Sequence, residues 1–98
     1  MVQKVIWDPV AEDQLDSTLH LHLSTFSSNS AQQLYDAIDE RIQVLLNYPM
    51  SGRPTTGSAV VRYVQIRKSH YLFYQTKSDT LLIVGLHSTK MSENPFFK

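Results

Sequence analysis

Residues 59–87 contain three runs of β-branched and aromatic residues, separated by two short polar breaks at 68–70 and 77–79. Runs of this composition, bounded by short polar segments, predict strands joined by hairpins. The third run, 81–86, is apolar throughout, so both of its faces are expected to be buried. The pattern therefore predicts a three-stranded antiparallel meander whose last strand lies inside the sheet.

The first helix is predicted to begin at Asp8-Pro9. An aspartate before the first turn can cap unpaired backbone N–H groups, and a proline in the first turn loses no hydrogen bond. Apolar residues then recur at intervals of three and four as far as Phe26. This spacing predicts an amphipathic helix.

A second helix is predicted after the polar break at 27–30. Ser30 and Gln33 have the spacing of a capping box at its start. Pro49 disfavours helical geometry at the residue before it, so the helix must end near Tyr48. The short break between the helices predicts an antiparallel helical hairpin.

A short segment, 3–7, precedes the helices and reads as a first strand. The order strand–helix–helix–strand–strand–strand predicts an α+β fold, in which an N-terminal helical hairpin packs on an antiparallel sheet. The first strand must join the same sheet, because alone it has no partner. A chain of 98 residues is expected to form a single domain, 1–98.

Composition narrows the functional classes. The chain has no cysteine, which excludes disulfides and thiolate metal sites. No apolar run is long enough for a membrane span or a signal peptide, so we expect a cytoplasmic protein without membrane partners. Net charge is zero but uneven: residues 1–40 hold one lysine and seven acids, whereas 41–98 hold eight basic residues and two acids. This predicts an acidic helical side and a basic sheet side.

The histidines do not form a recognisable metal motif. His20 and His22 are two residues apart on a predicted helix, so they face different sides and cannot chelate one ion. His70 and His87 are expected on one rim of the sheet. No phosphate loop or hydrolase motif is present, so neither a metal nor a cofactor is expected. Basic and aromatic residues in the meander suit either RNA or an acidic partner peptide; they are Arg62, Tyr63, Arg67, Lys68, His70, Tyr71, Tyr74 and Lys77.

A series of short motifs resembles the RelE/ParE toxins of bacterial type II toxin–antitoxin modules. The motifs are Trp7 with Asp8-Pro9-x-Ala11-x-x-x-Leu15, then Ala31, Ile38 and Leu45, then Pro49-x-x-Gly52-Arg53-Pro54, Val61-Arg62, Tyr71-Leu72-Phe73-Tyr74 and the run from Leu81 to His87. The resemblance covers nearly the whole chain and implies two helices packed on an antiparallel sheet. It also implies a cognate antitoxin as partner, and a toxin–antitoxin hetero-oligomer is among the assemblies it allows.

The family resemblance implies two possible targets. RelE-like members cut mRNA on the ribosome, but this chain has Tyr71, Met91 and Phe97 where those members have two arginines and a tyrosine. Each departure removes a group that could stabilise charge or exchange a proton. ParE-like members act on DNA gyrase by binding, and Arg62 and His87 fall where that branch often has an arginine and a histidine. We therefore expect gyrase-like binding rather than cleavage.

The expected binding residues, for the target or the antitoxin, are Arg62, Arg67, Lys68, Lys77, Phe96 and Phe97. One alternative is a ribosome-dependent endoribonuclease with a shifted catalytic set, consisting of His87, Lys90, Tyr71 and His70. In that case His87 would act as general acid or base. Another alternative is a non-toxic relative that acts only as a binding module.

Overall fold

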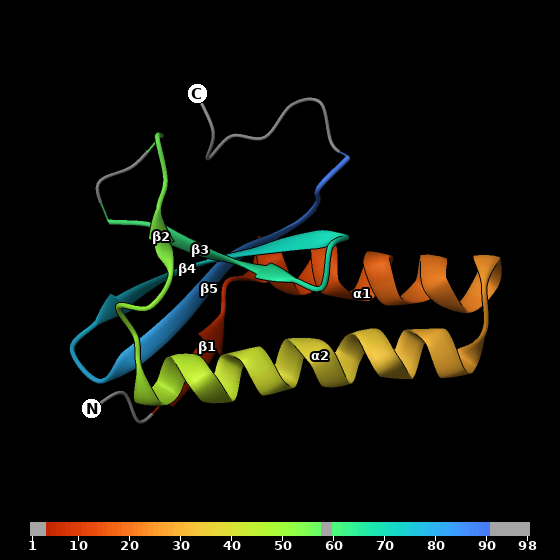
Figure 1. Cartoon of the computed structure of the whole chain (residues 1–98), viewed down its shortest axis with the longest axis horizontal. Helices are drawn as coiled ribbons and strands as arrows, with labels where there is room; N and C mark the ends of the chain where they lie inside the picture. Colours follow the sequence, from red (N-terminus) through yellow and green to blue (C-terminus); the bar gives the residue numbers. More distant parts are fainter. Residues whose placement is uncertain (1–3, 58–59, 91–98) are drawn as a thin grey trace.

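The computed structural model describes residues 4–57 and 60–90, which form a layer of two helices against one sheet (Figure 1). This confirms the predicted α+β architecture. In chain order the elements are β1 (Lys4–Trp7), α1 (Pro9–Thr25), α2 (Ser28–Asn47), β2 (Arg53–Pro54), β3 (Arg62–Ile66), β4 (His70–Lys77) and β5 (Thr80–Ser88).

The five strands lie in the order β1-β5-β4-β3-β2. Pairing is antiparallel from β2 through β5, as predicted for the sheet, whereas β1 runs parallel to β5 and makes the sheet mixed. The chain reverses direction from β3 to β4 and again from β4 to β5, so β5 points in the same direction as β3. Strand β1 points in that direction too. As predicted, β1 joins the sheet and β5 has a neighbour on each side.

The sequence did not predict β2. It consists only of Arg53 and Pro54, which pair with Tyr63 and Arg62 at the outer edge of β3. A proline lacks the backbone donor of a regular strand and is tolerated at a sheet edge. A two-residue strand in a loop rich in proline and glycine has no periodicity to detect.

The start of α2 also differs from the prediction. Ser27, not Ser30, is the N-cap, and its hydroxyl accepts a hydrogen bond from the Ser30 N–H at 3.0 Å. The connection between the helices is therefore shorter than the polar break suggested. Helix α1 begins at Pro9 as predicted, although the Asp8 side chain makes no capping hydrogen bond.

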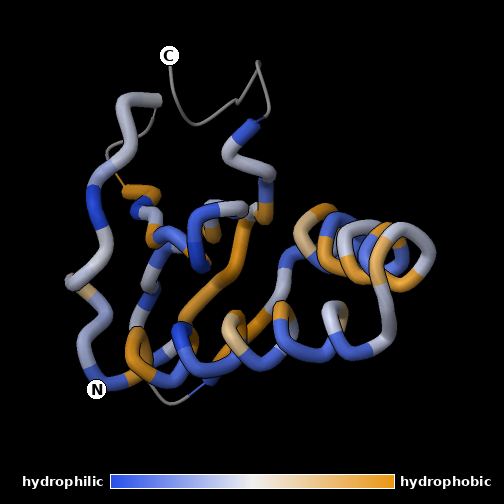
Figure 2. The backbone as a smooth tube through the Cα atoms, turned by 45° about the vertical axis from the view of Figure 1, so that its right-hand side comes forward, coloured by the Kyte–Doolittle hydropathy of each residue, from blue (hydrophilic) through white to orange (hydrophobic). Residues whose placement is uncertain are grey.

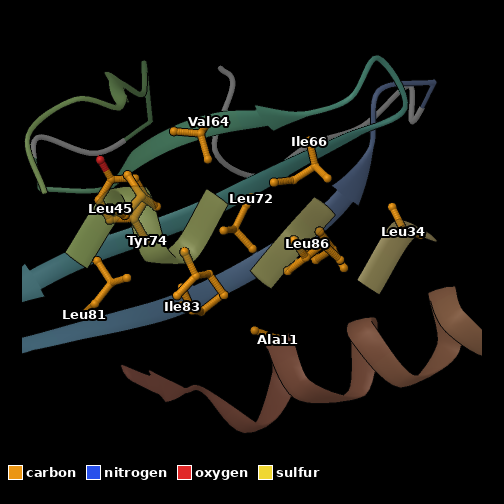
Figure 3. Close-up of a cluster of buried hydrophobic side chains, with 12 residues drawn as sticks. Ala11, Leu34, Leu45, Val64, Ile66, Leu72, Tyr74, Leu81, Ile83 and Leu86 are labelled. Atoms are coloured by element: carbon orange, nitrogen blue, oxygen red, sulfur yellow. The ribbon is translucent and has the colours of Figure 1, made fainter. Parts of the chain in front are cut away.

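The main core lies between the helices and one face of the sheet (Figure 3). Helix α2 contributes a stripe of four buried apolar residues at spacings of three and four, and α1 contributes the fully buried Ala11. The hydropathy colouring in Figure 2 shows apolar stretches of the strands running alongside the helices. The buried residues of the cluster are Ala11, Leu34, Ile38, Ile42, Leu45, Val64, Ile66, Leu72, Tyr74, Leu81, Ile83 and Leu86.

A bulge in β5 decides which of its side chains enter this core. Phe73 pairs with Gly85 and Tyr74 pairs with Ile83, so Val84 is an extra residue in the ladder. Side chains alternate between faces, and one extra residue reverses the alternation beyond it. Leu86 therefore joins Ile83 in the core, and the next residue, His87, faces the other side of the sheet.

In the described residues, neither helix is both long enough and apolar enough to cross a membrane.

Candidate functional site on the open face of the sheet

The face of the sheet opposite the helices carries Tyr63, Tyr71, Phe73 and His87, which we call the open-face cluster. Tyr63 and Tyr71 meet edge to face with ring centroids 5.5 Å apart, and Phe73 meets His87 in the same way at 5.6 Å. Tyr71 is the cross-strand partner of His87 in the β4–β5 pair. Phe73 is fully buried, so this face has a small aromatic core of its own.

His87 is a buried member of this cluster, with 8% of its surface exposed. Burial lowers the pKa of its imidazole below the ordinary 6.5, because burial disfavours the charged form. At neutral pH the ring is therefore uncharged. It can accept a proton, but it supplies no positive charge for a phosphate.

A cavity of about 410 Å³ lies where β5 extends beyond β1. Pairing of β1 with β5 stops at Trp7 and Ile83, and helix α1 runs along the rest of that edge. There the side-chain carbonyl of Gln14 accepts the Leu86 N–H at 2.9 Å. His87 also lines this cavity, together with residues of α1.

His70 lies on the helix side of the sheet, so the expected joint site with His87 does not form. Tyr71 is opposite His87, and His70, one residue earlier, therefore points to the other face. Its ring packs beside that of His22 on α1, with centroids 6.0 Å apart. Serine hydroxyls contact both Nδ1 atoms, Ser69 with His70 at 2.7 Å and Ser30 with His22 at 3.2 Å.

The two buried histidines predict a loss of stability in mild acid. Burial lowers the pKa of both His70 and His87 from 6.5, and nearby His22 lowers that of His70 further. Between each lowered pKa and 6.5, the unfolded chain binds more protons than the folded one. The free energy of unfolding therefore decreases as pH falls through this window. We expect a lower urea midpoint at about pH 5 than at about pH 7.5.

Carboxylate groups also take up protons as the pH falls, so the comparison of the two urea midpoints needs matched variants. His70→Gln should reduce the difference between the two midpoints, because it removes one of the responsible groups. His20→Gln, at an exposed position on α1, should leave the difference as in the wild type. Equal pH dependence in wild type and His70→Gln would contradict the assignment to this residue.

The predicted basic binding residues do not form one surface. Arg62 is half-buried, and its Nη1 donates a hydrogen bond to the Gly52 carbonyl at 2.8 Å. Arg67 and Lys68 are exposed in the turn before β4, whereas Lys77 is at the far end of that strand. A strand of this length separates its ends by about 23 Å.

Lys90 lies close to the turn that carries Arg67 and Lys68. The Thr89 hydroxyl donates to the Lys68 carbonyl at 3.0 Å, and the Thr89 N–H donates to the Ser69 carbonyl at 2.9 Å. These bonds bring three cations to one end of the sheet, which we call the basic end: Arg67, Lys68 and Lys90. Phe96 and Phe97, like Met91, lie outside the described residues.

A buried hydrogen-bonded anchor holds the loop between α2 and β2. The Tyr74 hydroxyl donates to the Pro49 carbonyl at 2.8 Å and accepts from the Gly52 N–H at 2.9 Å. Burial raises the pKa of Tyr74, although the Gly52 hydrogen bond and two nearby arginines partly oppose this. We call this arrangement the Tyr74 anchor. It fixes the residues just before Arg53.

Sequence reasoning missed two arginines beside this loop, Arg41 on α2 and Arg53 on β2. Both line a cavity of about 350 Å³ next to Tyr63 and Tyr71. They are twelve residues apart in different kinds of element, so no spacing links them in the sequence. The match of Arg53 to the family turn was a signal of loop structure and not of a site.

The family assignment follows from comparison with known proteins. The model of the family described as "ParE toxin of type II toxin-antitoxin system, parDE" matches residues 5–93. The chain belongs to this ParE toxin family. A toxin of a type II module has a cognate antitoxin, so membership implies such a partner for this ParE-family toxin.

Solved structures share the fold of this toxin. A chain of the chromosomal ParDE system from P. aeruginosa is 17% identical with a TM-score of 0.76, and the match covers 91% of this toxin and 98% of that chain. The YoeB/ParE toxin from Agrobacterium tumefaciens is 17% identical with a TM-score of 0.65, and the match covers 88% of this toxin and 98% of that chain. The structure of a YoeB dimer from Staphylococcus aureus is 10% identical with a TM-score of 0.61, and the match covers 87% of this toxin and 94% of that chain. Comparison with curated proteins gives no match.

Proposed function

We propose that this ParE-family toxin arrests growth by binding DNA gyrase, and that a cognate antitoxin neutralises it. The observation that carries this proposal is the separation of the residues that RNA cleavage would need. His70 packs against His22 on the helix side, whereas His87 belongs to the open-face cluster. The two imidazoles therefore cannot act together on one phosphate.

The chemistry of the open face also favours binding. RNA cleavage by acid–base catalysis needs a base, an acid and a positive charge near the phosphate in the transition state. The open-face cluster offers aromatic rings and a neutral, largely buried His87. Tyrosines and a buried aromatic centre are typical of protein–protein contact surfaces.

A ribosome-dependent endoribonuclease is the second candidate, and one observation favours it. Tyr71 and His87 are cross-strand partners, which places a phenol beside an imidazole on the same face. Lys90 follows β5 by two residues and could supply positive charge. This reduced set of three residues omits His70.

The basic end is the proposed contact for acidic groups of the antitoxin. Arg67 and Lys68 are exposed there and can pair with carboxylates, whereas Arg62 already holds the loop at Gly52. The tip of the helical hairpin exposes Leu21 and Phe26, whose exposed fractions are 61% and 67%. An antitoxin that covers this apolar surface would bury it from water. Lys77, Phe96 and Phe97 remain expected contacts of the target or the antitoxin.

A supercoiling assay beside a translation assay tests the proposal. We expect the purified toxin to inhibit gyrase supercoiling and to leave mRNA on translating ribosomes intact. Cleaved mRNA with normal supercoiling would contradict gyrase binding, and loss of that cleavage in His87→Ala would establish the endoribonuclease. Normal supercoiling and intact mRNA, together with normal growth on expression, would indicate a non-toxic relative.

The same assay tests neutralisation. Added antitoxin should restore supercoiling with wild-type toxin. For the double variant Arg67→Glu/Lys68→Glu, we expect at least tenfold more antitoxin to be needed, because the paired charges now repel. Lys4→Glu, an exposed charge reversal on β1, is the control. Equal antitoxin requirement for the double variant and the wild type would contradict the basic end as the contact.

A further inference from the structure

A polar cavity of about 350 Å³ lies at the edge of β3 that β2 leaves uncovered. Strand β2 pairs with β3 only at Tyr63 and Arg62, so within the described residues the edge of β3 beyond Tyr63 has no strand neighbour. Helix α2 and the loop after it form the other walls. The polar or aromatic lining residues come from five segments and are Arg41, Ser51, Arg53, Tyr63, Gln65 and Tyr71.

The cavity carries two uncompensated positive charges. Within residues 4–57 and 60–90, the guanidinium groups of Arg41 and Arg53 form no ion pair and no hydrogen bond, and no lining residue is acidic. Glu40, beside Arg41 in sequence, lines a neighbouring cavity of about 250 Å³ that Arg41 and Gln65 also line, but it forms no ion pair with Arg41 within the described residues. Guanidinium groups present several N–H donors in a plane and suit phosphate oxygens.

The walls are held in place before any ligand arrives. The Tyr74 anchor fixes the backbone at Gly52, and Arg62 donates to the Gly52 carbonyl from the neighbouring strand. Arg53 follows directly and is further held by pairing with Tyr63. Arg41, which lines the same cavity from α2, lies near enough for its positive charge to lower the pKa of Tyr74 slightly. A preformed site loses less entropy on binding.

Two aromatic rings stand beside the arginines. Tyr63 and Tyr71 meet edge to face at 5.5 Å, so their rings present different orientations at the cavity wall. Aromatic rings stack on nucleobases, whereas arginines contact the phosphate. Ser51 and Gln65 also line the cavity, and their side chains are hydrogen-bonding groups.

We propose that this cavity is a nucleotide-binding site. Arg41 and Arg53 bind the phosphate, and Tyr63 with Tyr71 contacts the base. The volume falls in the range of small-molecule sites, about 300–1,000 Å³. The site shares Tyr71 with the open-face cluster but uses arginines outside the residues expected to bind target or antitoxin. It is therefore independent of whether the toxin acts on gyrase.

Titration of the full-length toxin with AMP, followed by NMR chemical shifts, tests this site. We expect saturable shifts at Tyr63 and Tyr71, weaker saturable binding of inorganic phosphate, and no saturation with adenosine. Arg41→Gln and Arg53→Gln should each raise the Kd for AMP at least tenfold. Tyr63→Leu should weaken AMP binding and leave phosphate binding unchanged, because it removes only the contact to the base.

Lys4→Gln is the matched control, since it removes one positive charge at an exposed position on β1. Both arginines are exposed, so the folding of their variants is checked by thermal melting alongside the wild type. Absence of saturation by AMP would overturn the proposal. So would a loss of affinity in Lys4→Gln equal to that in Arg53→Gln, or binding of glutamate as tight as that of AMP, which would indicate a carboxylate site.

Discussion

Replacing Ile83 by alanine is expected to lower the free energy of unfolding by about 2–5 kcal/mol. Ile83 is fully buried and lies where three strands meet, because it pairs with Trp7 of β1 and with Tyr74 of β4. Its carbonyl also accepts the Asp8 N–H at 2.9 Å, at the point where β1 gives way to α1. Removing its methyl and methylene groups leaves a cavity that the surrounding backbone cannot close.

Leu82→Ala provides the comparison on the same strand. Leu82 is half-buried and its side chain points to the opposite face from that of Ile83, so we expect a clearly smaller loss for this variant. Urea unfolding measures both, and an unchanged slope would show that only stability has changed. Equal losses for the two variants would contradict the assignment of the main core to the helix side.

Gly52→Ala is expected to cost about 1–3 kcal/mol of stability, although the new side chain is a single methyl group. A Cβ atom at this position would lie 2.7 Å from Cε1 and 2.9 Å from Cζ of Tyr74, and it would also contact the Tyr74 hydroxyl. The Tyr74 ring is fully buried and cannot move aside. The Gly52 N–H would also lose its hydrogen bond to that hydroxyl.

A double-mutant cycle with Tyr74→Phe isolates this contact. Tyr74→Phe alone should destabilise the protein, because the Pro49 carbonyl and the Gly52 N–H both lose their partner. In the Tyr74→Phe background, the cost of Gly52→Ala should shrink, since the hydroxyl and its hydrogen bond are already absent. The same cost in both backgrounds would show that the clash is with the ring, which phenylalanine retains, and not with the hydroxyl.

The Tyr74 anchor connects these stability effects to function. It holds the loop from which Ser51 and Arg53 face the proposed nucleotide site. A variant that releases this loop should lose AMP binding along with stability. The arginine variants, at exposed positions, should lose binding alone, and this difference separates a structural role from a ligand contact.

The candidate site was only partly predictable. The aromatic character of the sheet, and the choice of Tyr71 and His87 as candidate site residues, followed from the composition of the strands and from the family resemblance. Their direct pairing required the β4–β5 register. Arg41 and Arg53 come together only because the loop after α2 folds back to pair with β3, and such a return leaves no periodic signal.

The sequence by itself determined the two helices, the meander and their stacking, because the spacing of apolar residues decides which face of each element avoids water. The family motifs were equally visible. Only the tertiary structure decided the faces of the two histidines. Residue spacing alone did not reveal that one extra residue in β5, Val84, would turn His87 away from the core, whereas His70 on β4 stays on the helix side. That single shift in strand register separates the expected catalytic pair.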